Sequence, residues 1–246
     1  MILMVSAMYR TSARRIWMAH SQASHSPLSD LDMTYSQNFF LHVVCEGKSE
    51  RNYLAALNRL LRDSGIGLTL LSPTPKKRDE DGGGHFRNVV QKYKDFRRNN
   101  RNVQPWIWVD WDLYLRNDQH CMELYESRPK GIPDFLFSIH NFEDFLVLHC
   151  SEDRVYEWIN ACREHNHFAA PMHSEEYMPL FKSQFPEYKK GELPDSLAML
   201  SNEQVENALI HTLDASIPFK CDFLEKLAKF IMARYPDAGR PWNVVK

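Results

Sequence analysis

Three acidic residues, Glu46, Asp110 and Asp112, stand where short apolar runs of the sequence end. Glu46 follows residues 39–45, and Asp110 closes residues 106–110. If these runs are parallel strands of one sheet, their carboxyl ends share an edge where ligands bind. Carboxylates that converge there repel one another, and Mg²⁺ or Mn²⁺, which prefer oxygen ligands, would offset the repulsion. The spacing therefore predicts a divalent-metal site.

A phosphate-binding element is predicted beside this metal site. Gly47 allows a tight turn directly after Glu46, and the helix that follows begins with free N–H groups and a positive dipole end. Lys48 adds a positive charge at the same place. A metal ion, a phosphate site and a nearby carboxylate together favour phosphodiester hydrolysis, with Glu46, Lys48, Asp110 and Asp112 as the candidate catalytic residues.

The predicted elements that position these residues alternate between strand and helix. The strand runs are nearly continuous in apolar residues, which is typical of parallel strands buried on both faces. Ser49 is the predicted N-cap of the first helix, which ends near Gly65 and Gly67. The first strand, this helix and the second strand form a βαβ unit. Strands are expected at 39–45, 67–71, 106–110 and 135–139, and the second helix at 86–101.

The sequence after residue 150 predicts helices only, near 152–165, 201–214 and 219–235. Pro171, Pro179, Pro186 and Pro194 indicate a loop-rich segment between the first and second of these helices. We therefore expect an α/β fold, with a core over 37–150 and a helical region over 151–246 that packs on it. Residues 1–36 are expected to be a poorly ordered leader or sequence upstream of the natural start.

The composition is that of a globular protein with reduced thiols. The chain has 246 residues, a formal net charge of −2 and five cysteines without a CxxC motif. No run of eighteen apolar residues occurs, so no membrane span is expected. A cytoplasmic location without membrane attachment is the prediction.

Positive charge is concentrated in one segment, residues 76–101, which carries nine Lys and Arg against four Asp and Glu. Phosphate binding depends on such local clusters, so the segment is a candidate nucleic-acid contact. Its alternative interpretation is an ordinary solvated helix face. The candidate contact residues on the predicted helix are Lys92, Lys94, Arg97 and Arg98.

Two further patterns have ordinary alternatives. Cys162, His165 and His167, with Cys150 and His173 nearby, resemble a zinc set, but their spacing fits no standard pattern. Trp108, Trp111 and Tyr114 are candidates for base stacking, although core packing is favoured for Trp108. No Walker loop is present, so ATP hydrolysis would need a separate partner.

Four segments of the chain combine features of the candidate site in a specific order. The first combines an acidic strand end with a turn and a following aromatic, Tyr53, and the second carries the two aspartates. The third precedes an apolar helix, and the fourth contains a Tyr-x-Lys pattern. They are residues 44–50 (VCEGKSE), 108–112 (WVDWD), 138–149 (SIHNFEDFLVLH) and 188–191 (YKKG), within roughly 38–215 of the chain. Taken together and in this order, they resemble the RloB-like family.

The resemblance implies a TOPRIM-like Rossmannoid fold. Glu46 would then act as general acid/base or metal ligand, Asp110 and Asp112 would hold Mg²⁺ or Mn²⁺, and Glu143 would be a further ligand. For Glu143 the alternative is simpler, because an acid in the first turn of a helix is favoured by the helix dipole alone. For the whole set the alternative is a structural or degenerate site.

The resemblance also implies a role in bacterial defence against phages, often beside an ATPase encoded nearby. The leading hypothesis is a metal-dependent nuclease that acts on DNA or on a structured RNA such as tRNA as a defence effector. The alternative hypothesis is a non-catalytic binding or sensor subunit of an ATPase-containing defence complex. A homo-oligomer is compatible with either.

Overall fold

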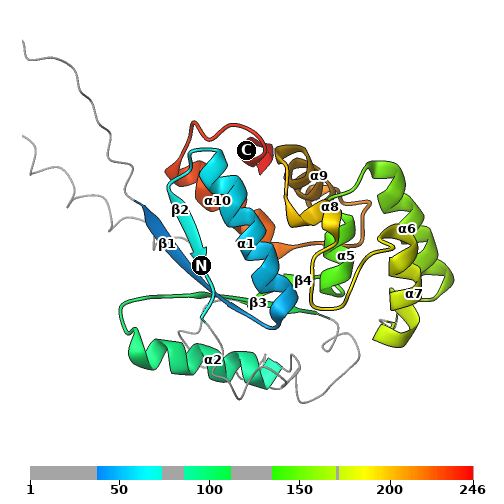
Figure 1. The fold of residues 1–246 in the computed structure, drawn as a ribbon, viewed down its shortest axis with the longest axis horizontal. Helices are drawn as coiled ribbons and strands as arrows, with labels where there is room; N and C mark the ends of the chain where they lie inside the picture. Colours follow the sequence, from blue (N-terminus) through cyan, green and yellow to red (C-terminus); the bar gives the residue numbers. More distant parts are fainter. Residues whose placement is uncertain (1–37, 74–85, 112–134, 170–171, 246) are drawn as a thin grey trace, which may run out of the picture. The chain divides into compact units, whose positions relative to one another are not determined.

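Four short parallel strands form the centre of the protein. The computed structural model describes residues 38–73, 86–111, 135–169 and 172–245. The strands pair in the order β2-β1-β3-β4 (Figure 1). They are β1 (Phe39–Cys45), β2 (Leu68–Leu71), β3 (Trp106–Asp110) and β4 (Phe135–Ser138). The expected α/β class with a parallel sheet is confirmed, and the strand bounds agree with the predicted ones to within a residue.

The strand order creates a switch point between β1 and β3. The chain leaves β1 toward β2 on one side and later returns to pair β3 with the other side of β1. The loops after these two strands therefore diverge, and a ligand site at the carboxyl edge is expected between them. In the register, Cys45 pairs with Trp108, so Glu46 and Asp110 follow at the same edge.

Both faces of the sheet are buried, which explains why the strand sequences are almost continuously apolar. Val44, Ile107 and Val109 pack with Val89 and Tyr93 of α2 (Phe86–Asn99) on one face. Alternate strand residues pack into a larger cluster on the other face, which includes α1 (Lys48–Asp63) and the C-terminal helices (Figure 1).

The start of α1 differs from the predicted one. The helix begins at Lys48, and Gly47 rather than Ser49 is its N-cap residue. The Glu50 side chain replaces the expected serine cap, because its Oε2 accepts a hydrogen bond from Gly47 N at 3.1 Å. The prediction of Ser49 as N-cap was wrong because a carboxylate three residues along can bond the cap backbone itself.

The region after β4 is helical, as expected. It contains α5 (Phe142–Val147), α6 (Glu152–Glu164), α7 (Ser174–Gln184), α8 (Asp195–Ala198), α9 (Asn202–Leu213), α10 (Asp222–Arg234) and the 3₁₀ helix η2 (Trp242–Val245). Buried residues of α5, α6, α7, α9 and α10 join the same hydrophobic cluster as α1. The segment before α10 also covers the edge of β4, where Ile139 N donates to Lys220 O at 2.9 Å.

The prediction of a loop-rich segment after α6 was wrong at α7. This helix contains Pro179, which removes one backbone hydrogen bond and normally disfavours a helix interior. Tyr177 and Phe181, on either side of the proline, are buried in the main cluster. Tertiary packing of these two rings therefore stabilises a helix that local propensity disfavours.

Candidate metal centre

The carboxylates of Glu46 and Asp110 meet at the switch point, as their positions at strand ends predict. Asp110 N donates a hydrogen bond to Glu46 Oε2 at 3.0 Å, which joins the ends of β1 and β3. Glu50 lies with them, and one carboxylate oxygen of each of the three residues lies within 4.8 Å of the other two. We refer to Glu46, Glu50 and Asp110 as the carboxylate cluster.

Glu50 is the member of the cluster that the sequence interpretation missed. Its first-turn position on α1 and its bond to Gly47 N turn the carboxylate back toward the strand end. The signal was available in the spacing, because Glu50 follows Gly47 by three residues, as in a capping box. A Cβ on Gly47 would lie 3.1 Å from Glu50 Oε2, so glycine gives the carboxylate the room to approach.

Burial makes a negative charge costly at this edge. Glu50 is 4% exposed, and its burial raises the pKa of its carboxyl to about 7, with a further upward contribution from the charge of Glu143. A buried carboxylate of this kind is stabilised by a cation or by protonation. The cluster thus has the electrostatic character of a cation site.

Glu143, in the first turn of α5, lies beside the cluster and is not one of its three members. Tyr188 Oη donates to Glu143 Oε1 at 2.8 Å, and the Tyr177 hydroxyl also bonds this carboxylate. Burial raises the pKa of Glu143, and the Tyr188 bond opposes that increase. Both tyrosines come from the helical region, so that region supplies part of the surroundings of the cluster. The role of Glu143 as a ligand stays a prediction.

A positive charge lies against the cluster from α2. Lys92 Nζ donates to the backbone oxygen of Glu46 at 3.1 Å. Lys92 was predicted as a nucleic-acid contact, and the structure places it at the candidate metal centre. Lys48, the first residue of α1, is exposed.

The other three predicted nucleic-acid contacts on α2 differ in whether they bond other residues of the chain. Arg97 donates to the backbone oxygens of Arg101 and Val103, and so closes the end of its own helix. Arg98 forms an ion pair with Asp95 at 3.1 Å. Lys94 is exposed. Nucleic-acid contact by this helix stays a prediction.

Two predicted site residues, Asp112 and Tyr114, lie outside the described residues. Trp108 is fully buried and stacks on Phe223 with ring centroids 4.3 Å apart, so the preference for core packing is confirmed. Trp111 packs edge-on against Phe137, with ring centroids 4.4 Å apart.

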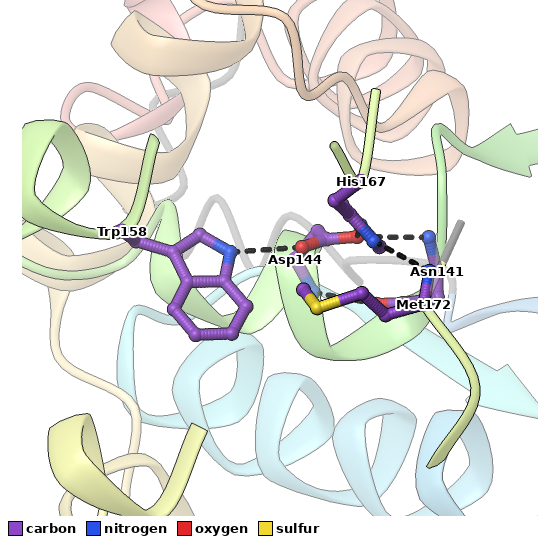
Figure 2. A network of polar contacts seen from close by, with 5 residues as sticks. All are labelled: Asn141, Asp144, Trp158, His167 and Met172. Atoms are coloured by element: carbon purple, nitrogen blue, oxygen red, sulfur yellow. Dashed lines mark hydrogen bonds and ion pairs between the residues drawn. The ribbon is translucent and has the colours of Figure 1, made fainter. Parts of the chain in front are cut away.

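A second group of possible ligands, Asp144, Cys162 and His167, is buried. Figure 2 shows Asp144 and His167 with the residues that they bond. Met172 N donates to His167 Nδ1 at 2.9 Å, so the ring proton is on Nε2, which donates to Asp144 Oδ2 at 2.9 Å. Neither ring nitrogen then has a lone pair for a metal. Trp158 Nε1 donates to Asp144 Oδ1 at 2.8 Å. The group is a hydrogen-bonded network, and its geometry disfavours the zinc interpretation.

Comparison with known proteins adds no constraint on this site. The chain matches no model of a protein family, no curated protein and no solved structure. Among the described residues, no helix is both long and apolar enough to span a membrane.

Proposed function

We propose that the protein is a divalent-metal-dependent nuclease whose metal centre is the carboxylate cluster. The observation that carries the proposal is the convergence of Glu46, Glu50 and Asp110 at the switch point of a parallel sheet, with ligand oxygens within 4.8 Å of one another. This is where ligands bind in open α/β sheets.

The residues fit Mg²⁺ or Mn²⁺ better than other ions. All three candidate ligands are carboxylate oxygens, which hard cations prefer. Oxygens at about 2.1 Å from one Mg²⁺ are at most about 4.2 Å apart, which is compatible with carboxylate oxygens that lie within 4.8 Å of one another. When bound, the ion would polarise a phosphate and lower the pKa of an attacking water.

Side chains of the protein would transfer the proton and compensate the charge of the substrate. Glu46 would accept the proton of the attacking water at the strand end. Lys92, bonded to Glu46 O, and the exposed Lys48 would offset the negative charge of an approaching phosphodiester. Asp112 would be a further ligand, as the DxD spacing predicts.

The test is cleavage by the purified full-length chain with Mn²⁺, using plasmid DNA, single-stranded DNA and total tRNA as substrates. Cleavage that disappears in the Glu46→Gln variant and in EDTA would support the proposal and identify the substrate class. Equal cleavage by the variant would contradict it. Metal binding without cleavage of any substrate would favour the non-catalytic subunit.

The resemblance to RloB-like proteins supports a wider proposal. On that basis the nuclease would act as an effector in defence against phages, with an ATPase partner encoded nearby. Cell growth on induction of the wild type and of Glu46→Gln, with and without the neighbouring gene, tests this role: toxicity that needs Glu46 is the expected result.

A further inference from the structure

A tight turn in the helical region carries two exposed lysines and is attached to residues that neighbour the carboxylate cluster. Glu192 N donates to Lys189 O at 2.9 Å, which closes a turn over residues 189–192. Gly191 has a φ of +86°, a value that glycine adopts readily at the third position of such a turn. Lys189 and Lys190 are both exposed. We refer to residues 189–192 as the basic turn.

Two hydrogen bonds attach the basic turn to the surroundings of the cluster. Just before it, Tyr188 is 1% exposed and bonds Glu143, the buried acid next to Glu50. Within it, Gly191 O accepts a hydrogen bond from Asn52 Nδ2 of α1 at 3.0 Å. These two attachments hold the turn against the start of α5, which carries Glu143, and against the N-terminal half of α1, which carries Glu50 of the cluster.

Lys48 belongs to the same surface. Its Cδ lies 3.8 Å from the position that a Cβ on Gly191 would occupy, so its stem runs alongside the basic turn. Lys48 precedes Glu50 by two residues, and all three lysines are exposed. Two segments about 140 residues apart in the chain therefore bring cations to one place.

We propose that Lys48, Lys189 and Lys190 form the surface that binds the phosphate backbone of the nucleic acid on its way into the carboxylate cluster. The inference rests on the proposed nuclease function and names the contact that this function needs. Buried carboxylates repel a polyanion, so a strand can approach only if cations beside them neutralise its phosphates.

The inference depends on where the lysines lie and not on the net charge of the basic turn, which is small. Glu187 and Glu192 flank the two lysines and balance them in number. The alternative basic surface is α2, where Lys92 bonds Glu46 O, Arg97 closes its own helix and Arg98 pairs with Asp95. Those three cations are engaged within the chain, and Lys94 is a further exposed cation of α2. The basic turn, in contrast, is held through its backbone and through Tyr188.

The experiment measures binding separately from cleavage. Fluorescence anisotropy of an end-labelled single-stranded oligonucleotide, prepared as DNA and as RNA of the same sequence, is followed in EDTA for the full-length chain. We expect K189A/K190A to bind both oligonucleotides at least about tenfold more weakly near 0.1 M salt, since each lost phosphate contact costs roughly this factor. The salt slope should fall by about 0.7 for each lysine that contacts a phosphate of the single strand.

Two control variants remove the same amount of charge elsewhere. K182A/K229A changes exposed lysines of α7 and α10 and should leave the Kd unchanged. K94A/R98A changes two exposed cations of α2, and a loss of affinity confined to this variant would assign binding to α2 and overturn the inference. Unchanged affinity of K189A/K190A, or no binding of either oligonucleotide by the wild type, would overturn it as well.

Failure of the inference can be distinguished from failure of the proposed function. If the wild type binds the oligonucleotides through these lysines but cleaves no substrate, the phosphate-binding surface is supported and the nuclease function is contradicted. If cleavage needs Glu46 but proceeds equally in K189A/K190A, the nuclease function is supported and the phosphate-binding role of the lysines is contradicted.

Discussion

At the residue scale, Glu50 connects helix capping with candidate metal binding. Its carboxylate accepts from Gly47 N and also faces Glu46 and Asp110. Local structure therefore sets the orientation of a candidate ligand, because the bond to Gly47 N turns this carboxylate toward the strand end. This coupling gives two predictions that concern single side chains.

Glu50→Gln should weaken Mn²⁺ binding by more than tenfold, because a neutral amide replaces one of three charged oxygen ligands. The amide oxygen can still accept from Gly47 N, so the melting temperature without metal should change little. Titration calorimetry with Mn²⁺ measures the affinity, and Glu175→Gln on the exposed side of α7 is the matched control. Equal affinities in both variants would exclude Glu50 as a ligand.

Gly47→Ala should destabilise the protein through Glu50 rather than through its own backbone. Gly47 has an extended backbone with a φ of −129°, which alanine also adopts, but its Cβ would lie 3.1 Å from Glu50 Oε2. We expect a loss of about 1 kcal/mol in the free energy of unfolding, a usual size for a tight contact. Urea unfolding of Gly47→Ala, Glu50→Ala and the double variant measures this.

The double variant decides the cause. If the contact is responsible, the cost of Gly47→Ala should largely disappear once Glu50 is alanine, with a coupling energy above about 0.5 kcal/mol. Additive losses would show that Gly47 is needed for another reason.

At the element scale, the network around Asp144 joins the start of α5 to α6 and to the segment after it. Asp144 accepts from Trp158 Nε1, His167 Nε2 and Asn141 N, and His167 accepts from Met172 N (Figure 2). Because Glu143 precedes Asp144, the network also fixes the helix turn that carries the acid beside Glu50. The Asp144 network therefore orients α5 relative to α6 and to the segment after it.

Asp144→Ala should lower the free energy of unfolding by about 3–5 kcal/mol, because it leaves buried donors of Trp158, His167 and Asn141 without an acceptor. Urea unfolding measures the loss, and Asp153→Ala, an exposed acid of α6, should change stability by less than about 0.5 kcal/mol. Zinc found in stoichiometric amount in the purified wild type, and absent from Asp144→Ala, would contradict the network interpretation.

At the scale of the whole molecule, we expect the buried His149 to make stability depend on pH. His149 Nε2 accepts from Tyr53 Oη at 2.7 Å, and Nδ1 donates to Leu146 O at 3.2 Å, in the cluster shared by α1 and α5. Burial lowers the pKa of His149 from 6.5 to about 4. The folded protein therefore binds this proton more weakly than the unfolded chain does.

The wild type should lose stability because of His149 as the pH falls from about 6.5 to about 4, by roughly 3 kcal/mol in total. Above pH 6.5 the imidazole is neutral in both states, so its contribution is fully present there. Glu50 and Glu143, whose pKa values are raised, act in the opposite direction. Comparing variants therefore isolates the histidine contribution.

Urea unfolding at pH 7.5 and 4.5 tests this dependence in the wild type, in His149→Gln and in His165→Gln. His149→Gln should be less stable at pH 7.5 and should show a smaller loss on acidification. His165 is exposed, so its variant should follow the wild type. An unchanged pH dependence in His149→Gln would exclude this histidine as a cause.

The sequence by itself determined the parallel α/β class, the strands and most helices, and the meeting of Glu46 and Asp110. Strands buried on both faces need continuous apolar runs, and parallel strand ends share one edge, so these features are encoded locally. Periodicity also located the long helices α2, α9 and α10.

Only the tertiary structure decided the rest of the candidate site. Glu50 joins the cluster because α1 packs on the sheet, and α7 forms around Pro179 because its two aromatic residues are buried. The basic turn reaches the cluster through Asn52 and Tyr188, from segments far apart in the chain. For Glu50 the local capping spacing sets the orientation of the carboxylate, and the packing of α1 brings it to the strand ends. The contacts of α7 and of the basic turn depend on the packing of whole elements, and no local pattern of residues records them.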